Sequence, residues 1–145
     1  MWAPWRMLES DHDAFIVELR ALEGLLKRHC SGPRCPARIL KRVEKFIRHF
    51  EGHMDSHFKA EEMAVFPHLR RHAPRLSPTL LYLIAEHRAI LKAMAAWKRS
   101  FKKAKAKKSA TDQGTALGRQ GLKLVRLLRA HVVKESGIMS RFTSQ

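Results

Sequence analysis

The sequence has few cysteines and no long apolar run, and each shortage narrows what the protein can be. Two cysteines in 145 residues, Cys30 and Cys35, are too few for a zinc framework, although they can bridge if oxidised. No segment approaches the roughly 18 apolar residues of a membrane span, and the N-terminal residues lack the apolar core of a signal peptide. We therefore expect no membrane span and a cytoplasmic location.

Acidic residues are also scarce, so the chain is strongly basic. Lysine and arginine number 29 against 13 aspartates and glutamates, which gives a formal net charge of +16. The basic residues form two outward stripes and one cluster: Arg38, Lys41, Arg42, Lys45 and Arg48; Arg119, Lys123 and Arg126; and Lys98 to Lys108. Such a charge favours polyanions or acidic proteins as partners, or serves only as a solvated face. No helix-turn-helix or zinc-finger signature predicts sequence-specific reading.

The apolar residues predict four helices and no convincing strand. They recur at intervals of three and four over roughly residues 10–29, 36–66, 77–104 and 115–139. Amphipathic helices with short connections are typical of an up-down-up-down bundle. At 145 residues, one all-α domain spanning residues 1–145 is the simplest organisation, with a basic loop over residues 98–111.

Local signals predict where some of these helices begin and end. Ser10 can cap the first helix, and Asp13, three residues later, completes a pair similar to a capping box. Pro67 and Pro74 predict a break after the second helix, because proline lacks the N–H that a helix interior needs. Residues 68–76 are therefore expected to form a connection.

Polar residues interrupt the inward apolar faces at matching depths. The pattern His-x-x-x-Glu occurs twice, and residues four apart share one face of a helix. Together with one histidine on each of the other two helices, the set is His12, His57, Glu61, His87, His131 and Glu135. A single inward histidine is usually a satisfied core residue. Two buried carboxylates need cations, however, because an unpaired ionised carboxylate costs several kcal/mol or more to bury. The set therefore predicts a metal site.

These residues resemble a known family, the hemerythrin-like (HHE cation-binding) domains. The resemblance rests on Asp11-His12, the run from His57 to Pro67, Glu86-His87 and the run from His131 to Glu135, in family order over nearly the whole chain. It implies a four-helix bundle with a non-haem di-iron centre, bridged by carboxylates and an oxo or hydroxo group. In that centre Glu61 and Glu135 would bridge the two iron ions, and the four histidines would be terminal ligands.

One departure from the family's oxygen carriers concerns the third helix. The carriers have His-x-x-x-His there, whereas Leu91 stands four residues after His87. One iron would then have a ligand fewer, which disfavours reversible oxygen carriage and favours peroxide chemistry, iron sensing or iron binding. His53, one turn before His57, is an additional candidate for the vacant position.

Two kinds of function follow from these observations. In the first, a di-iron centre binds or reacts with O2, peroxide or nitric oxide, with or without enzymatic turnover, or senses iron or oxygen. In the second, the metal only stabilises the bundle, and the basic surface binds nucleic acid or acidic partners. Glu62 and Glu86 point about 100° away from neighbouring ligand positions, so we expect them beside the site or on the surface. A monomer or dimer is expected.

Overall fold

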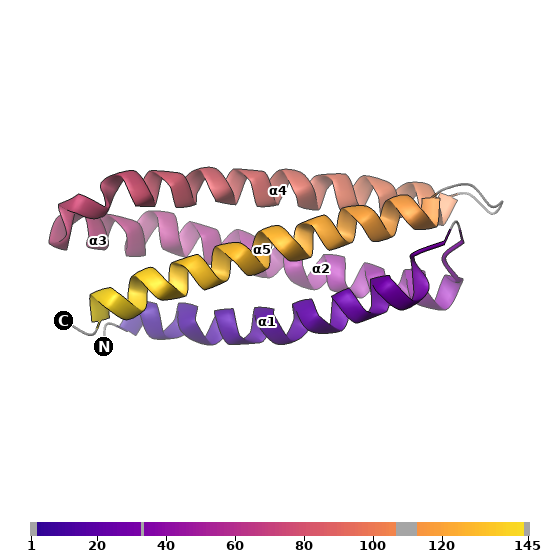
Figure 1. The fold of residues 1–145 in the computed structure, drawn as a ribbon, viewed down its shortest axis with the longest axis horizontal. Helices are drawn as coiled ribbons and strands as arrows, with labels where there is room; N and C mark the ends of the chain where they lie inside the picture. The colour runs from indigo at the N-terminus through magenta and orange to yellow at the C-terminus, as the bar shows by residue number, and fades with distance from the viewer. Residues whose placement is uncertain (1–2, 33, 107–112, 144–145) are drawn as a thin grey trace.

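The computed structural model describes residues 3–32, 34–106 and 113–143, which form a four-helix bundle (Figure 1). Its long helices are α1 (Ala3–His29), α2 (Ala37–Ala60), α4 (Ser77–Ala106) and α5 (Gln113–Thr143). Shorter elements η1 (Glu61–Val65), α3 (Phe66–His72) and η2 (Pro74–Leu76) join α2 to α4. No strand occurs in this described part of the chain, so the expected all-α bundle is confirmed.

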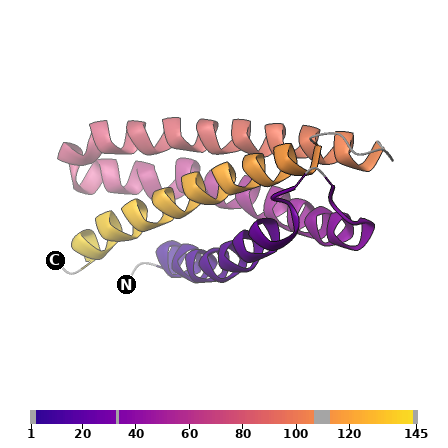
Figure 2. The same ribbon diagram turned by 45° about the vertical axis from the view of Figure 1, so that its right-hand side comes forward.

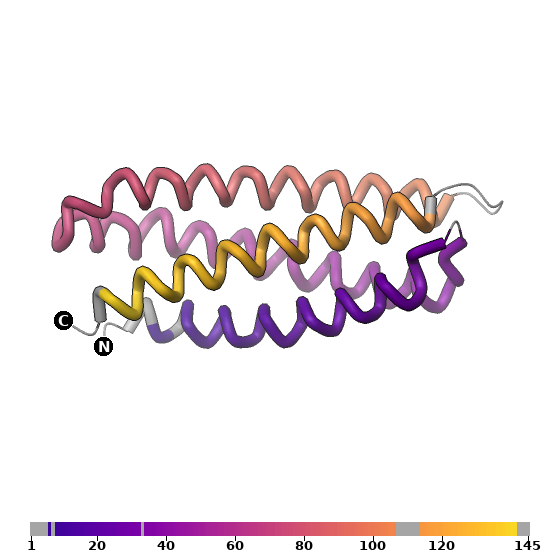
Figure 3. Tube along the Cα trace, viewed as in Figure 1, coloured from indigo at the N-terminus to yellow at the C-terminus, as the bar shows by residue number. Residues whose placement is uncertain are grey.

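The four long helices form a closed ring of neighbours. α1 packs against α2 and α5, and α4 packs against the same two helices. α1 begins and α5 ends at one end of the bundle, whereas α1 and α4 end, and α2 and α5 begin, at the other (Figure 3). α5 runs between α1 and α4 in two views of the ribbon (Figures 1 and 2). None of the described helices is long and apolar enough to span a membrane.

α1 begins seven residues before the predicted start. It begins at Ala3, so Ser10 is an interior residue and not a cap, and the predicted capping box is wrong. Proline is tolerated in a first helical turn, where its missing N–H has no partner to lose, so Pro4 does not prevent this start. Leu8 is 3% exposed and extends the inward apolar stripe by one turn before His12.

The chain remains helical through Pro67, where the sequence predicts a break. η1 is a π-helical segment in which the Phe66 N–H donates to the Glu61 carbonyl, one residue further back than in an α-helix. Pro67 then falls in the first turn of α3, where no donor is needed. Of the predicted connection over residues 68–76, only Ala73 lies outside a helical element.

The basic stretch after Trp97 is helical and not a loop as far as Ala106. Trp97 and Phe101 are buried in the core, which holds this part of α4 against its neighbours. The rest of the predicted basic loop falls on residues 107–112, outside the described residues. Between α1 and α2, at the same end of the bundle, Cys30 and Cys35 are free thiols whose sulfur atoms lie 3.2 Å apart.

Two apolar clusters fill the bundle core, one toward each end. The larger includes Phe15, Phe50, Trp97 and Leu128, and the smaller, near the chain termini, includes Leu8. The smaller cluster also contains Val65, Phe66, Leu69, Leu80, Leu83 and Met139. Along each of α1, α2 with η1, α4 and α5, a short polar interval separates the residues of one cluster from those of the other. The six predicted polar residues lie in that interval.

Candidate metal centre

Six buried polar side chains converge between the two apolar clusters. They are the six predicted residues, and none is more than 3% exposed: His12, His57, Glu61, His87, His131 and Glu135. Their ligand atoms form two groups of four, within each of which all atoms lie within 4.8 Å of one another. Each group has two histidines, and Glu61 and Glu135 belong to both groups. This is the arrangement expected of two neighbouring cations held by shared carboxylates.

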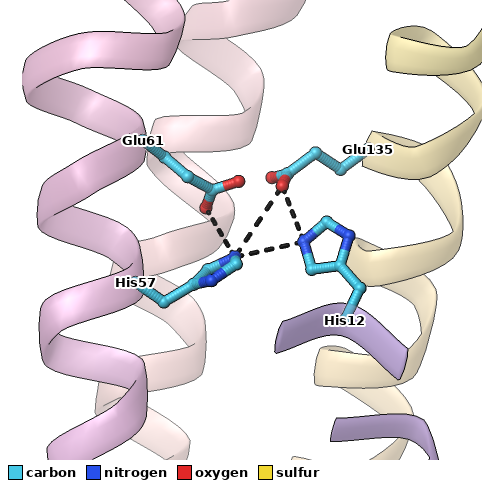
Figure 4. A group of neighbouring side chains, drawn as sticks. All are labelled: His12, His57, Glu61 and Glu135. Atoms are coloured by element: carbon cyan, nitrogen blue, oxygen red, sulfur yellow. Dashed lines mark hydrogen bonds and ion pairs between the residues drawn. The ribbon is translucent and has the colours of Figure 1, made fainter. Parts of the chain in front are cut away.

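The first group joins α1, α2, η1 and α5 (Figure 4). The Nε2 atoms of His12 and His57 lie 3.1 Å apart. Glu135 Oε1 lies 2.9 Å from the first of these nitrogens and 3.9 Å from the second. Glu61 Oε1 lies 3.5 Å from His57 Nε2, and Glu61 follows His57 by about one helical turn where η1 continues α2. All four side chains point toward a common centre (Figure 4).

The second group joins η1, α4 and α5 and repeats this geometry. The Nε2 atoms of His87 and His131 lie 3.1 Å apart. Glu61 Oε1 lies 3.0 Å from His87 Nε2, and Glu135 Oε2 lies 3.0 Å from His131 Nε2. Glu135 therefore directs Oε1 toward the first group and Oε2 toward the second. In Glu61, by contrast, Oε1 approaches both His57 and His87.

The outer nitrogen of each imidazole is held by a residue from a neighbouring helix. His57 Nδ1 lies 3.2 Å from Asp11 Oδ2, His87 Nδ1 2.9 Å from Glu62 Oε2, His131 Nδ1 2.9 Å from Glu86 Oε1, and His12 Nδ1 3.2 Å from Ser136 Oγ. Each of these partners is next in sequence to one of the six inward residues. The contacts run from α1 to α2, from η1 to α4, from α4 to α5 and from α5 back to α1, which closes a ring around the bundle.

These outer contacts determine what the imidazoles offer to the centre. A carboxylate only accepts hydrogen bonds, so the Nδ1–H groups of His57, His87 and His131 are the donors. In a neutral imidazole the opposite nitrogen then carries a lone pair. Lone pairs on Nε2 and carboxylate oxygens thus face one another across the centre, and they repel unless a cation lies between them.

The pKa values express the same demand for positive charge. Burial, with the neighbouring His57, lowers the pKa of His12 to about 4. Burial alone would also lower the pKa of His57, but the carboxylates of Glu61 and Asp11 outweigh it and raise that pKa. Burial would raise the pKa of Glu61, but the imidazoles of His57 and His87 outweigh it and lower the pKa to about 2. Glu61 therefore stays ionised inside the protein.

Comparison with known proteins identifies the family of this chain. The model of the hemerythrin HHE cation-binding domain matches residues 3–142. The chain belongs to the hemerythrin HHE family. No curated protein and no solved structure matches this chain.

The donor set of this HHE domain fits metal ions. Both oxygens of Glu61 and both oxygens of Glu135 are buried and have no hydrogen-bond partner, although imidazole nitrogens lie within ion-pair distance of both residues. A buried carboxylate without a partner costs several kcal/mol, so these two glutamates require another partner such as a cation. Imidazole and carboxylate donors suit divalent transition metals. The residues present therefore match the cation-binding role of the HHE family.

Aromatic rings in this HHE domain shield the second histidine pair from water. The Phe58 ring stacks on the His87 imidazole, with ring centres 3.9 Å apart and planes 11° from parallel. Phe66 stacks on the same imidazole at 5.8 Å. In the first pair, the Phe15 ring contacts the His57 imidazole edge to face, with ring centres 5.5 Å apart. A dry, ring-lined site strengthens electrostatic interactions, because the local dielectric constant is low.

His53 and Leu91, the two positions near His57 and His87 that bear on a further ligand, both lie outside the cluster. His53 is exposed and belongs to neither group; its ring lies 4.3 Å from that of His49 and 6.0 Å from that of Phe15. Leu91 is 43% exposed, so the position four residues after His87 lies toward the surface. The proposed substitute ligand is therefore not part of the cluster that the described residues form.

The outer ring of contacts was only partly foreseen from sequence. The sequence predicts Glu62 and Glu86 beside the site or on the surface, and both contact a buried histidine while remaining partly exposed. No sequence pattern singles out Ser136, and Asp11 is distinguished only as the neighbour of His12. The signal that finds all four is adjacency: a polar residue one position from an inward ligand is rotated by about 100°, toward the next helix.

Proposed function

We propose that this HHE domain holds two iron ions and that the resulting centre binds or reacts with O2, peroxide or nitric oxide. The observation that carries the proposal is the pair of buried donor groups sharing both glutamates. His12 and His57 would hold one ion, and His87 and His131 the other. Glu61 and Glu135 would bridge them, because each carboxylate lies within reach of both histidine pairs.

The number of protein donors leaves room for small ligands. Each group supplies four donor residues, which is fewer than an octahedral ion accepts. Neither Leu91 nor His53 adds a donor, as their exposure indicates. Bound iron supplies one-electron redox chemistry and these vacant coordination positions. We therefore favour reaction with a small oxidant or nitrogen oxide, or sensing of it, over reversible oxygen carriage.

A groove of about 190 Å³ opens from solvent beside His57, one member of the first histidine pair. It lies between α1 and the junction of α2 with η1, and its lining includes Leu8, Asp11, Ser56, His57 and Val65. Its walls are mostly apolar, which suits a small uncharged ligand. Asp11 is 42% exposed in its side chain, so it joins the buried His57 imidazole to solvent. Asp11 would thus fix the orientation of the His57 imidazole from the groove wall.

The first test is the metal content and optical spectrum of protein purified in air. We expect about two irons per chain, with near-ultraviolet absorption from an oxo- or hydroxo-bridged pair. His87→Ala and Glu135→Ala should lose iron and this absorption while circular dichroism remains helical. His72→Ala is the matched control, because His72 is exposed and lies outside both groups. A folded wild-type protein that takes up no iron would refute the proposal.

Reactivity needs a separate experiment on the reduced, iron-loaded protein. The protein is mixed in turn with O2, hydrogen peroxide and a nitric oxide donor, and the spectrum is followed in time. We expect a spectral change with at least one of these, absent from the metal-free protein. Repeated turnover with excess reductant would indicate an enzyme, whereas a single reversible change would indicate a sensor. Iron that responds to none of the three would restrict the role of the metal to structure.

A further inference from the structure

Charge is segregated along the long axis of the bundle. Residues 24–50 and 88–129 contain 21 of the 29 lysines and arginines but only two acidic residues, Glu44 and Asp112. The remaining residues contain eight basic and eleven acidic side chains. The two segments cover the end of α1, the first part of α2, most of α4 and the first half of α5. The described residues of these segments make up the half of the bundle away from the start of α1 and the end of α5 (Figure 1), which we call the basic end.

Few of the cations at the basic end are neutralised by ion pairs. Glu44 lies 2.9 Å from Arg48 and 3.4 Å from Lys105, and Glu23 lies 2.8 Å from Arg129. Lys27 and Lys98 also have carboxylate partners. Among the described residues, a larger number of exposed cations have no carboxylate within ion-pair distance: the rows Arg38, Lys41, Arg42 and Lys45 on α2 and Arg119, Lys123 and Arg126 on α5 are examples.

These rows place like charges three and four residues apart on one helix. That spacing brings the side chains together on the helix surface, so each row destabilises the isolated protein slightly. The rows on α2 and α5 also lie on different sides of the bundle, because these two helices are not neighbours in the ring. The folded chain therefore keeps a repulsive surface that a polyanion would stabilise.

The basic end offers little apolar surface to a protein or a membrane. The large exposed apolar side chains of the described residues are Val17, Met63, Leu81, Tyr82, Leu91 and Val133, and of these only Leu91 falls within it. Protein interfaces use aromatic and other apolar anchors, and peripheral membrane helices insert an apolar face. A flexible or grooved polyanion such as a nucleic acid needs no apolar anchor.

We propose that the basic end binds the phosphate backbone of nucleic acids without reading their sequence. Exposed lysine and arginine rows neutralise phosphates and release the counterions that surround them. The absence of base-reading motifs in the sequence agrees with contacts to phosphate alone. The candidate metal centre lies in the other half of the bundle, so binding requires neither iron nor the glutamates that would hold it.

The test measures the affinity of the full, iron-loaded chain for a fluorescent 24-base-pair DNA duplex of mixed sequence. Anisotropy titrations at several salt concentrations give the affinity and its salt dependence. The triple variant Arg119→Gln, Lys123→Gln and Arg126→Gln should bind at least about ten-fold more weakly. Its plot of log affinity against log salt should lose up to about 0.9 in slope for each phosphate contact removed.

A matched control separates the basic end from net charge. Arg70→Gln, Arg71→Gln and Arg75→Gln remove three exposed arginines near the other end, in α3 and η2. This control should change the affinity less than about two-fold. Glu135→Ala should bind DNA as the wild type does, which distinguishes this proposal from that of the metal centre.

Three outcomes would overturn the proposal. The first is the absence of binding at low salt, and the second is an equal loss of affinity in the two triple variants. The third is tighter binding to phosphatidylserine vesicles than to DNA at equal salt, with the same dependence on Arg119, Lys123 and Arg126. That result would assign the basic end to membranes.

Discussion

Each of the four buried histidines is fixed from two directions, and the two directions come from different helices. Its own helix places Nε2 in the centre, and a polar side chain from a neighbour holds Nδ1. Three of these neighbours are carboxylates and one, Ser136, is neutral. A carboxylate increases the basicity of the imidazole and fixes its tautomer, which a hydroxyl does less strongly. His12 is therefore the histidine whose orientation depends least on an outer charge.

Asp11→Asn should weaken iron binding although Asp11 would not touch the metal. Loss of the carboxylate opposite His57 Nδ1 removes the acceptor that fixes this ring, and such changes typically cost about 10- to 100-fold in metal affinity. Competition with a chromophoric chelator measures the effect. Asp55→Asn is the control, because Asp55 is exposed, pairs with Lys59 and should leave the affinity unchanged. Equal affinities in the two variants would contradict a role for the outer ring.

Sequence periodicity predicts the six inward residues well and their outer partners poorly. His57 and Glu61 follow from one apolar stripe, because the stripe continues through both positions. The partner of His57 is on another helix, and its identity depends on how far each helix is rotated about its axis. His53 illustrates the same limit, because one turn of the helix before a ligand brought it to the surface and not into the cluster.

At the scale of elements, the π-helical segment η1 connects backbone geometry to the site. A π turn accommodates one extra residue per hydrogen-bonded ring, and such turns occur frequently at functional sites. Here it begins at Glu61 and ends just before Pro67. The sequence rule that proline ends a helix failed because the rule assumes α-helical bonding up to the proline. No pattern of apolar residues distinguishes the two kinds of turn over only five positions.

Gly118→Ala should destabilise the protein through the packing of α5 against α1. A methyl group there would collide with the backbone carbonyl of Cys30, which cannot move without shifting the end of α1. We expect a loss of about 1–3 kcal/mol in the free energy of unfolding, as for other overpacked sites. Urea denaturation measures it.

The control for this prediction is Gly137→Ala on the same helix. No atom lies within 4 Å of a side chain added there, so only the higher helix propensity of alanine remains. This change should stabilise the protein by roughly 0.5–1 kcal/mol. Equal effects of the two substitutions would contradict close packing at Gly118.

At the scale of the whole molecule, the polar centre divides the core into two apolar clusters. The four-helix topology was predictable because apolar stripes and short connections leave few other solutions. The depth of the site followed from the same topology, since the early part of one helix meets the late part of its neighbour. The segregation of charge between the two ends did not follow, because the basic segments are separate in sequence and only the fold brings them together.

Acid should destabilise the metal-free protein. The pKa of His12 is lowered from 6.5 to about 4, mainly by burial, so between these values the unfolded chain binds a proton that the folded chain excludes. The lowered pKa of Glu61, about 2, extends the same loss to more acidic solutions, and the raised pKa of His57 opposes part of it. We expect a loss on the order of 2 kcal/mol between pH 7 and pH 4.

Urea denaturation of the metal-free protein at several pH values measures this loss. His12→Gln removes the titrating group and should flatten the dependence between pH 6.5 and pH 4, as the pKa range of His12 requires. His72→Gln should leave the dependence unchanged. A protein that becomes more stable in acid would contradict the sign of these shifts.

The separation of charge along the bundle gives the molecule a large permanent electric dipole. The positive pole is the basic end, and the negative pole is the end that carries the chain termini and most of the acidic residues. Such a molecule turns in the field of a polyanion before it makes contact. It would arrive end-on, with its long axis pointing away from the charged surface. The groove beside His57 would then face open solvent, accessible to small uncharged molecules even when the protein is bound.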